Sequence, residues 1–566
     1  MKLFKTLKNV FSDSDILLWV YPVLLIVPNI LLDITELYSP VSKAANLLLP
    51  LGIYYLIISA CRRTGITGLV MFIFAFFAAF QIVLLNLYGE GIIAIDMFLN
   101  VATTNVSEAT ELLGSLLIAI AIICILYIPP IIASIMQTAS HSLASAKAVK
   151  RARITGAVLA LCGVLCAVAS CVYIPDYKLK RELFPVNVMD NLCTAVKRTI
   201  ATQKYEQTSS DFRFNATSTH DKELKEVYVL MVGETSRAEN WQLTGYSRPT
   251  NPRLSKRTNL VYFPLALSES NTTHKSVPMI LSHLDSHNYG DSIYYTKSIS
   301  EAFNEAGFHT AFISNQRRNH SFIDFFGGQA HTTEFIIDEF DSPQHDLELV
   351  GRMKRAIDNA NSSKVMIVLH AYGSHFNYKE RYPKEEARFL PDNNTEAAAF
   401  NRSQLLNAYD NSIAYTDLVL DSIVSTLQSY RCPAALVYLS DHGEDIFDDS
   451  RERFLHASPA GTYHQLHVPF IVWTSNEYRS MFPEKVNAMI DNKGKNISSS
   501  ASAFHTTADL AGISTYVLNP SASVADTAYT EPQRLFLNDY LEGVPLRKSG
   551  LRKPDFEMLD KRGFKY

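Results

Sequence analysis

The loop SESNTTHKSVPM, residues 268–279, places five hydroxyl side chains around one histidine and one lysine. A hydroxyl becomes a good nucleophile only when its proton is removed or masked, and a bound divalent cation can do this by lowering the hydroxyl pKa. Thr272, Thr273 and Ser276 are all candidates by residue type. A structural alternative is that Ser276 and one threonine cap a helix that begins near Pro278. Residue types alone leave this choice open.

Candidate metal ligands occur in two other short segments. Glu234 lies in VGETS, and Asp441 and His442 lie in SDHGE. Carboxylate oxygens and an imidazole nitrogen form a shell that suits zinc, which keeps one position open in catalytic sites. Taken singly, Glu234 could be an acid in the first turn of a helix, and the Asp-His-Gly turn could be a helix cap. Their joint occurrence in one domain favours a metal site.

The elements that would position these residues are short, nearly continuous apolar runs. Such runs, alternating with helical patterns such as 404–429, predict an α/β domain with a mainly parallel sheet covered on both faces. Ligands of these sheets bind at the carboxyl ends of the strands, and Glu234, His375, Asp441 and His442 all follow runs of this kind. We therefore expect them to meet at one edge. The runs are VYVLMVGETSR at 227, HTAFISNQ at 309, KVMIVLHAYGSH at 364, AALVYLSDHGE at 434 and HVPFIVW at 467.

The N-terminal part of the 566-residue chain has a different character. It contains long apolar runs, and about 20 apolar residues are enough to cross a bilayer. These runs predict a transmembrane domain of five helices at 1–174, a bridging segment near the membrane surface at 175–222, and a catalytic domain at 223–566. The predicted spans are about 16–36, 45–61, 66–88, 112–136 and 154–174.

The distribution of charge predicts the orientation in the membrane. Basic residues precede the first span, follow the second and precede the fifth, whereas the loop at 89–111 has no lysine or arginine. The positive-inside rule then places the N-terminus in the cytoplasm and the C-terminal domain outside. A net charge of −4 argues against a nucleic-acid partner. Only Cys193 and Cys432 lie in the predicted soluble part, so at most one disulfide is expected there.

Several longer motifs resemble those of one family. The segments VGETSRAENWQLTGYSRPTNP, NTTHKSVPMILSH, HAYGSHFNYKERYP, NAYDNSIAYTD, SDHGED with FLHASP, and HVPFIVW occur in the family's order. The chain resembles the phosphoethanolamine transferases of Gram-negative inner membranes, which include lipid A modifying enzymes and the mobile colistin resistance enzymes. This resemblance covers nearly the whole chain and implies a catalytic domain like those of the alkaline phosphatase and sulfatase superfamily.

The resemblance also implies roles for single residues. Thr273 matches the nucleophile, three residues before Ser-Val-Pro, and the zinc ligands would be Glu234, Thr273, Asp441 and His442. Two histidines outside this set, His375 and His456, match residues linked to the donor phosphate, a second metal or proton transfer. The structural alternative for these histidines is an ordinary hydrogen bond. One zinc ion would bind tightly, and a second would be possible during turnover.

The loop between the third and fourth predicted spans offers a further match. Asn100, Thr104 and Glu108 are spaced at i, i+4 and i+8, which places them on one face of a helix predicted near 97–111. Family members use this pattern to hold the ethanolamine lipid, so the resemblance implies substrate-binding roles for these three, together with His375 and His456. The alternative is a solvated amphipathic surface helix.

The chain departs from the family pattern at two places. The family often brackets its nucleophile loop with a disulfide, and Glu269 and Met279 stand at those positions here. The loop must then be held by packing and hydrogen bonds. The SNQ of residues 314–316 resembles the branch that acts on lipopolysaccharide core sugars more than it resembles the disulfide-rich lipid A enzymes.

Together these features lead us to expect a zinc-dependent phosphoethanolamine transferase. It would be a multi-pass protein of the Gram-negative inner membrane, a monomer, with its catalytic domain in the periplasm. The donor would be phosphatidylethanolamine and the acceptor lipid A or a lipopolysaccharide core sugar, with a covalent intermediate on threonine. Alternatives are a metal-dependent phosphodiesterase, a phosphoglycerol-type transferase and a lipid-binding scaffold. Sulfatases need a Cys/Ser-x-Pro-x-Arg motif, which this loop lacks.

Overall fold

The computed structural model describes residues 12–103, 116–175, 177–340, 344–394 and 396–566. The chain divides into two compact units, with the boundary between Lys197 and Arg198. The first unit is helical, and the second is an α/β unit built on a seven-stranded sheet. The domain boundaries at 174 and 222 stay predictions.

The first unit contains the expected apolar spans. Among the described residues, four helical segments are long and apolar enough to cross a membrane, and the pair Thr64–Val70 and Phe72–Tyr88, bent by 47°, makes a fifth if it is one span. The predicted span at 66–88 coincides with this bent pair, so the helices allow four or five crossings where five were predicted. The helices are α2 (Ser14–Leu25), α3 (Val27–Thr35), α4 (Pro40–Ile58), α5 (Thr64–Val70), α6 (Phe72–Tyr88), α7 (Ile95–Thr103), α9 (Leu117–Ala139), α10 (Ala146–Tyr173) and α11 (Leu179–Glu182), and α12 (Val186–Gln203) continues across the boundary into the second unit.

The close packing of α4 against α10 depends on small residues. A Cβ atom on Gly52 would lie 2.4 Å from the backbone nitrogen of Ala160, and one on Gly163 would lie 2.4 Å from that of Leu49. Helices in lipid gain little from apolar burial against each other, so small residues that let backbones approach closely are what stabilises such pairs. The two glycines therefore bring the second and fifth spans together.

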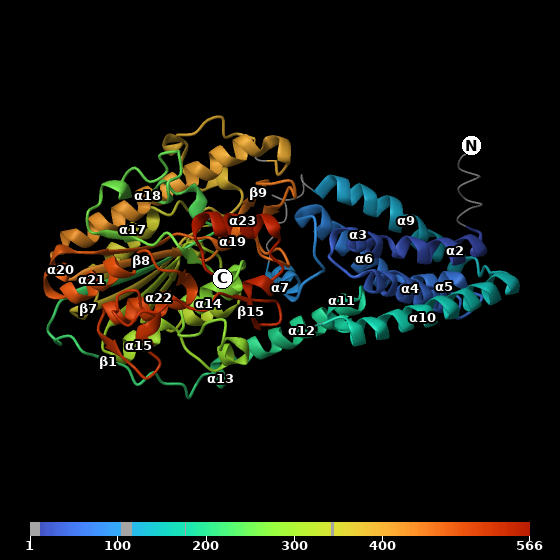
Figure 1. Ribbon diagram of the computed structural model, residues 1–566, viewed down its shortest axis with the longest axis horizontal. Coiled ribbons are helices and arrows are strands. Elements are labelled where there is room, and N and C mark those ends of the chain that lie inside the picture. Colours follow the sequence, from blue (N-terminus) through green and yellow to red (C-terminus); the bar gives the residue numbers. More distant parts are fainter. Residues whose placement is uncertain (1–11, 104–115, 176, 341–343, 395) are drawn as a thin grey trace. The chain divides into compact units, whose positions relative to one another are not determined.

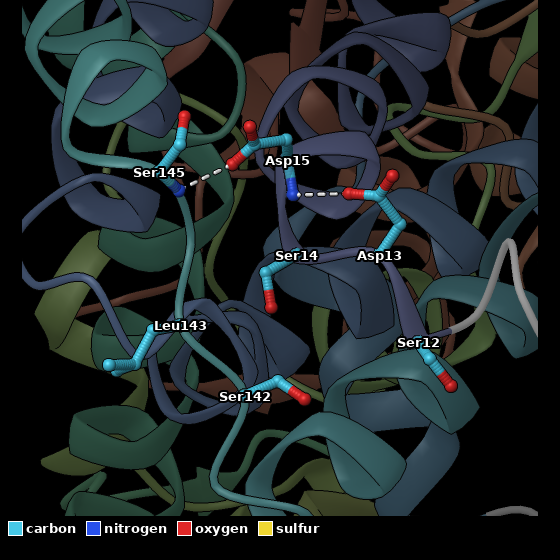
Figure 2. A pocket seen from close by; sticks show the side chains of 7 residues that line it. All are labelled: Ser12, Asp13, Ser14, Asp15, Ser142, Leu143 and Ser145. Atoms are coloured by element: carbon cyan, nitrogen blue, oxygen red, sulfur yellow. Dashed lines mark hydrogen bonds between the residues drawn. The ribbon is translucent and has the colours of Figure 1, made fainter.

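The amino ends of the first and fifth spans are tied to each other. Asp13 caps α2, since its Oδ1 accepts from the backbone N–H of Asp15 at 2.8 Å, and Asp15 Oδ1 accepts from the N–H of Ser145 at 2.8 Å. Ser145 in turn caps α10. These residues line a surface pocket (Figure 2). Because both spans begin at the same end, they run in the same direction, as five crossings require.

The second unit is built on one mixed sheet. The strand order is β3-β11-β8-β2-β7-β5-β6. The five strands from β8 to β6 are parallel, whereas β11 is antiparallel to both β8 and β3. The mainly parallel sheet was predicted correctly. The strands are β2 (Glu226–Gly233), β3 (Leu260–Tyr262), β5 (His309–Ser314), β6 (Thr332–Phe335), β7 (Lys364–His370), β8 (Ala434–Ser440) and β11 (Phe470–Thr474).

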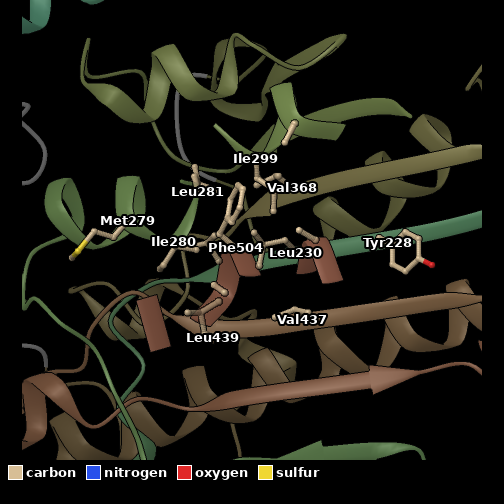
Figure 3. Packing of buried hydrophobic residues seen from close by; sticks show 14 of the residues in the cluster. Tyr228, Leu230, Met279, Ile280, Leu281, Ile299, Val368, Val437, Leu439 and Phe504 are labelled. Atoms are coloured by element: carbon tan, nitrogen blue, oxygen red, sulfur yellow. The ribbon is translucent and has the colours of Figure 1, made fainter. Parts of the chain in front are cut away.

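Helices cover both faces of this sheet (Figure 1). On one face lie α17 (Glu348–Asp358) and α18 (Arg402–Ser429), and on the other α14 (Thr273–Ile280), α15 (Ile299–Glu305) and α22 (Ser499–Leu510). The core on the second face takes alternate residues of the strands, as the period of two requires. Figure 3 shows this packing, with Leu230, Val368 and Val437 from the sheet against Ile280 and Phe504 from the helices.

Smaller elements complete the second unit. They are α13 (Tyr205–Thr208), β1 (Thr217–Ser218), β4 (Ala266–Leu267), α16 (Phe322–Gly327), β9 (Asp445–Ile446), β10 (Phe454–Leu455), α19 (Tyr463–Leu466), α20 (Asn476–Met481), α21 (Pro483–Asn492), β12 (Ile497–Ser498), β13 (Ile513–Ser514), β14 (Leu535–Leu537), β15 (Gly543–Pro545) and α23 (Lys553–Arg562).

Candidate metal centre

The site lies at the carboxyl edge of the central parallel strands. Gly233 at the end of β2 pairs with Ser440 at the end of β8, so the residues that follow them, Glu234 and Asp441, emerge at the same level. The third central strand, β7, ends at His370 beside Val232 of β2, and the chain then reaches His375. The sheet register therefore brings together residues that lie about 200 positions apart in the sequence.

Four predicted ligand residues meet in one cluster. His442 Nε2 lies 3.4 Å from Glu234 Oε1 and 3.2 Å from Asp441 Oδ2. Thr273 Oγ1 lies 3.1 Å from His442 Nε2 and 3.3 Å from Glu234 Oε1. Glu234, Asp441 and His442 are buried, whereas Thr273 is half-buried. Glu234 and Asp441 therefore form a buried acidic cluster, and Thr273 lies at its more exposed, open side.

The chemistry of these donors fits a zinc ion. Asp441 Oδ1 accepts the backbone N–H groups of Thr235 and His442, but Oδ2 is buried and has no hydrogen-bond partner among the described residues. Burial raises the pKa of Asp441 to about 7. His442 Nδ1 lies 2.9 Å from the carbonyl oxygen of Gly443, to which it can donate, and this leaves the Nε2 lone pair for a metal. An unpaired buried oxygen beside a second carboxylate is costly unless a cation compensates it.

Two histidines line the open side of the cluster. The ring of His456 lies 4.1 Å from that of His442 and 5.9 Å from that of His375, between centroids. Ligand atoms of Glu234, His442 and His456 all lie within 4.8 Å of one another. Burial lowers the pKa of His456 to about 3 and that of His375 to about 4, so both imidazoles are neutral at neutral pH. They can accept a proton or bind a metal, and their predicted roles stay predictions.

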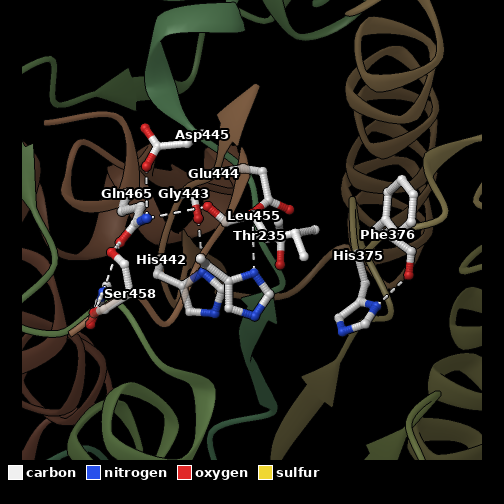
Figure 4. Close-up of polar contacts among 12 residues, drawn as sticks. Thr235, His375, Phe376, His442, Gly443, Glu444, Asp445, Leu455, Ser458 and Gln465 are labelled. Carbon is white, nitrogen blue, oxygen red and sulfur yellow. Dashed lines mark hydrogen bonds and ion pairs between the residues drawn. The ribbon is translucent and has the colours of Figure 1, made fainter. Parts of the chain in front are cut away.

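Hydrogen bonds fix the orientation of both histidines. His456 Nδ1 lies 3.1 Å from Glu444 Oε1, and His375 Nδ1 lies 2.7 Å from the carbonyl oxygen of Phe376. Figure 4 shows Glu444 on the SDHGE turn and His375 beside Phe376. With each Nδ1 facing an acceptor, each Nε2 is left free to act on a ligand. We did not predict Glu444 as a site residue, although it lies in the same turn as Asp441.

The side chain of Glu234 is also held from two directions. Thr235 Oγ1 donates to its Oε1 at 2.6 Å, and Gln316 Nε2 donates to its Oε2 at 3.0 Å. Gly373 packs directly on its backbone, because a Cβ atom there would lie 2.5 Å from the Glu234 carbonyl oxygen, and its φ of +56° favours glycine. Partners that orient a metal ligand commonly matter for metal affinity. Gln316 was missed as a site residue, although it follows the end of β5.

The nucleophile loop leads directly into a helix. α14 begins at Thr273, so the helix start expected near Pro278 was wrong, and Pro278 lies inside the helix. Thr272 is buried and faces Ser270 Oγ, and Ser276 is buried with its hydroxyl near the carbonyl of Ser270. Thr273 is the one of the three candidates that faces the acidic cluster. Its place at a helix N-terminus, where backbone N–H groups are unpaired, suits a phosphate.

Glu269 stands where family members often have a disulfide cysteine, and here its hydrogen bonds hold the nucleophile loop. Its buried carboxylate accepts from Ser286 Oγ and from the backbone N–H of Ala501 at 3.1 Å, and its carbonyl accepts from the N–H of Leu537 at 2.7 Å. One residue thus connects the nucleophile loop to three distant segments. Burial raises the pKa of Glu269 to about 7. All seven cysteines, each within the described residues, are free thiols.

Reducing agent should therefore leave the protein almost unchanged. We expect dithiothreitol to shift neither the melting temperature nor the activity measurably, because hydrogen bonds rather than disulfides hold the loop. Losing a native disulfide typically costs about 2–5 kcal/mol, which a thermal melt would detect. The measurement is a melting curve with and without reductant. A drop of several degrees would show that Cys193 and Cys432 pair after all.

Of the three residues predicted to hold the lipid in the loop between the third and fourth spans, one lies in the described part of the chain. Asn100 belongs to α7 (Ile95–Thr103). Thr104 and Glu108 lie outside the described residues. Their roles, and that of Asn100, stay predictions.

Comparison with known proteins identifies the kind of molecule that this site belongs to. The Sulfatase family profile matches residues 226–513. The phosphoethanolamine transferase EptA of Escherichia coli K12 is 31% identical over 311 residues, which are 54% of this chain and 56% of that protein. The chain thus spans about half the length of the curated relatives it matches.

Two solved structures extend the comparison. The integral membrane lipooligosaccharide phosphoethanolamine transferase EptA from Neisseria meningitidis matches 92% of this chain and 98% of its own, with a TM-score of 0.69 and 20% identity. The C-terminal periplasmic domain of EptC from Escherichia coli, solved in complex with zinc, matches 59% of this chain and 96% of its own, with a TM-score of 0.53 and 24% identity. At these identities both matches bear on the fold alone. They support a helical membrane unit joined to a sulfatase-like α/β unit.

Proposed function

Because the chain belongs to the sulfatase family, with residues 226–513 matching its profile, we propose that it transfers phosphoethanolamine through a covalent adduct on Thr273. The observation that carries the proposal is the approach of Thr273 Oγ1 to Glu234 and His442 at the sheet edge. Similarity to transferases of this kind supports the choice of the phosphoethanolamine group. A hydrolase would share the site but would pass the group to water.

The reaction divides into two displacements at phosphorus. In the first, Thr273 Oγ1 bonds to the donor phosphorus, the bond to the diacylglycerol oxygen breaks, and that oxygen leaves with a proton. In the second, an acceptor oxygen takes the phosphoethanolamine and Thr273 regains its proton. The neutral imidazoles of His375 and His456 line the open side, where an Nε2 lone pair can accept the proton that moves in one step and return it in the next.

We assign zinc binding to Glu234, Thr273, Asp441 and His442. The ion would stabilise the threonine alkoxide and the negative charge on the phosphoryl oxygens. His456 lies close enough to this set to hold a second ion during turnover, together with His375. The N-terminus of α14 adds partial positive charge beside Thr273.

The donor and the cellular setting follow from the same proposal. The donor would be phosphatidylethanolamine in the inner membrane of a Gram-negative cell, with the catalytic unit in the periplasm and the N-terminus in the cytoplasm. The acceptor would be lipid A or a core sugar of lipopolysaccharide. The presence of four or five possible spans among the described residues supports a lipid donor. We expect a monomer to be sufficient, because all assigned residues come from one chain.

The deciding experiment follows the transferred group. Lipopolysaccharide from cells with and without the gene would be compared by mass spectrometry. A phosphoethanolamine increment that appears only with the active gene supports the proposal, and its position on lipid A or core sugar identifies the acceptor. If purified enzyme releases free phosphoethanolamine from phosphatidylethanolamine but modifies no lipopolysaccharide in cells, the protein is a phosphodiesterase instead.

The donor-binding role of the loop after α6 can be tested separately. A Glu108→Ala or Asn100→Ala enzyme should use phosphatidylethanolamine in vesicles at least about tenfold more slowly. The first variant loses a carboxylate that can take a charge-assisted hydrogen bond from the ammonium group, and the second loses an amide that can hydrogen-bond to the headgroup. Both variants should cleave a small soluble phosphodiester at the rate of the unmodified enzyme. The measurement compares full-length variants on the two substrates. Equal rates on vesicles would mean that these residues only belong to a surface helix.

A further inference from the structure

A buried glutamine, Gln465 in α19, uses all the hydrogen-bonding positions of its side chain. Its Oε1 accepts from Asn271 Nδ2 at 2.7 Å and from Ser458 Oγ at 3.1 Å. Its Nε2 donates to Asp445 Oδ2 at 2.7 Å and to the carbonyl oxygen of Leu455 at 3.2 Å (Figure 4). A glutamine amide offers two acceptor and two donor positions, so these bonds satisfy it completely. Because Gln465 is fully buried, a lost partner would leave a polar atom unpaired in the interior.

The partners of this amide lie in the two loops that carry Thr273 and His456. Asn271 is two residues before Thr273 in the nucleophile loop, and Leu455 directly precedes His456. The Oε1 end of the amide therefore holds the nucleophile loop, and the Nε2 end holds the loop of the histidine. Because both atoms belong to one planar group, the amide determines how far apart the two loops lie.

Asn271 also contacts the loop of His456 directly. Its Nδ2 donates to the carbonyl oxygen of Ser458 at 2.9 Å, and its own carbonyl oxygen accepts from the N–H of Ala457 at 3.0 Å. The first contact determines which way the Asn271 amide faces, since a carbonyl oxygen can only accept. The same Nδ2 can then donate to Gln465 Oε1. The two loops are thus joined on both sides of His456.

The metal-binding turn is held by the main chain of Gln465 instead. The carbonyl oxygen of Gln465 accepts from the N–H of Gly443, directly after His442, at 2.7 Å. The predicted zinc ligands that follow β2 and β8 are placed by the sheet register. A change of the Gln465 side chain leaves both of these contacts in place. It should therefore disturb the two loops and spare the turn.

We propose that Gln465 is a positioning residue of the transfer reaction, whose side chain sets the approach of His456 Nε2 to Thr273 Oγ1. The inference rests on the proposed function and adds a residue that acts only through its neighbours. Proton transfer needs its partners within hydrogen-bonding reach, and a misplacement of about 1 Å can cost about 100-fold in rate. A residue with only a structural role would lower the stability of the protein and leave the rate of the folded enzyme unchanged.

The first measurement removes the hydrogen bonds of the amide and keeps its volume. Gln465→Met should lower kcat, and the rate of adduct formation on Thr273, at least about tenfold at saturating phosphatidylethanolamine. KM should change by less than about twofold and the zinc content should stay unchanged, because the contacts to substrate and metal remain. Rates are taken per zinc-loaded molecule, well below the melting temperature, so that a loss of stability does not produce the fall.

Asn411→Leu is the matched control. Asn411 is also fully buried, and its amide donates to the Asp392 carboxylate and the Phe389 carbonyl, but it holds a loop that carries none of the assigned site residues. This variant should melt at a lower temperature and keep its kcat. If Gln465→Met does not fold, Asn271→Ala removes the same contact from the nucleophile loop and should lower kcat in the same way.

A reversed pair provides the rescue. In the double variant Gln465→Glu with Asp445→Asn, the new carboxylate accepts from Asn271 and Ser458 as before, and the new amide donates to it, so three of the four hydrogen bonds return. Its kcat should recover to within about threefold of the unmodified enzyme. An unchanged kcat in Gln465→Met, an equal fall in Asn411→Leu, or a double variant no faster than Gln465→Met would overturn the proposal. An unmodified enzyme that forms no adduct would refute the proposed function itself, and this inference with it.

Discussion

Replacing Thr273 by alanine should abolish transfer, with a fall of about 1,000-fold or more, because Thr272 and Ser276, the other two candidate hydroxyls of its loop, turn away from the carboxylates toward Ser270. Its Oγ1 lies 3.1 Å from His442 Nε2, at the first residue of α14, where the helix N-terminus can also receive the phosphoryl group. A missing nucleophile cannot be replaced by better binding, since each later step needs the covalent bond. Intact-protein mass spectrometry after incubation with phosphatidylethanolamine should find a phosphoethanolamine adduct on the unmodified enzyme and none on Thr273→Ala.

Thr272→Ala provides the matched control. Thr272 precedes the nucleophile directly, is 3% exposed and interacts with Ser270 in its own loop. Its loss should lower stability slightly and leave most of the activity, and the adduct should still map to Thr273. An adduct on another residue, or transfer by Thr273→Ala at the normal rate, would contradict the assignment.

The fold was predictable because its central strands are buried on both faces. Every residue of β2, β7 and β8 is buried, and such continuous apolar runs can be recognised in the sequence. The edge strands β3 and β6 were missed, since β6 is only four residues long and partly exposed, and its pattern resembles that of a loop. The antiparallel direction of β11 was also not predictable, because direction depends on the connection rather than on composition.

The residues of the site that follow the ends of parallel strands were predictable from the sequence. Glu234, Asp441 and His442 follow strand ends, and parallel neighbours must bring their ends to one edge. The choice of Thr273 over Thr272 and Ser276 needed the resemblance, since all three are hydroxyls of the same loop. Only the structure shows that Thr272 and Ser276 turn toward Ser270 while Thr273 faces the acidic cluster.

The supporting contacts could not be predicted from local patterns. Glu269 bonds to Ser286, 17 residues away, and to Ala501, 232 residues away, and nothing in SESN marks a buried carboxylate. Gln316 reaches Glu234 across 82 residues. Such contacts depend on side chains that meet only after the sheet and its covering helices have packed. A residue at a strand end is a candidate, but its partner is visible only in three dimensions.

Removing one of the two carboxylates of the acidic cluster should release the zinc ion. In Asp441→Asn the unpaired Oδ2 is replaced by an amide group of similar size, so packing is kept while one negative charge and one good ligand are lost. We expect the purified variant to contain much less zinc by elemental analysis and to be about 100-fold less active. Asp417→Asn is the control, because Asp417 is equally buried but interacts with Arg253 and Leu254, through their backbone N–H groups and an ion pair with the Arg253 side chain. That variant should be less stable yet keep its zinc. A full zinc content in Asp441→Asn, or the same zinc loss in both variants, would mean that Asp441 supports the fold of the turn and does not bind the ion.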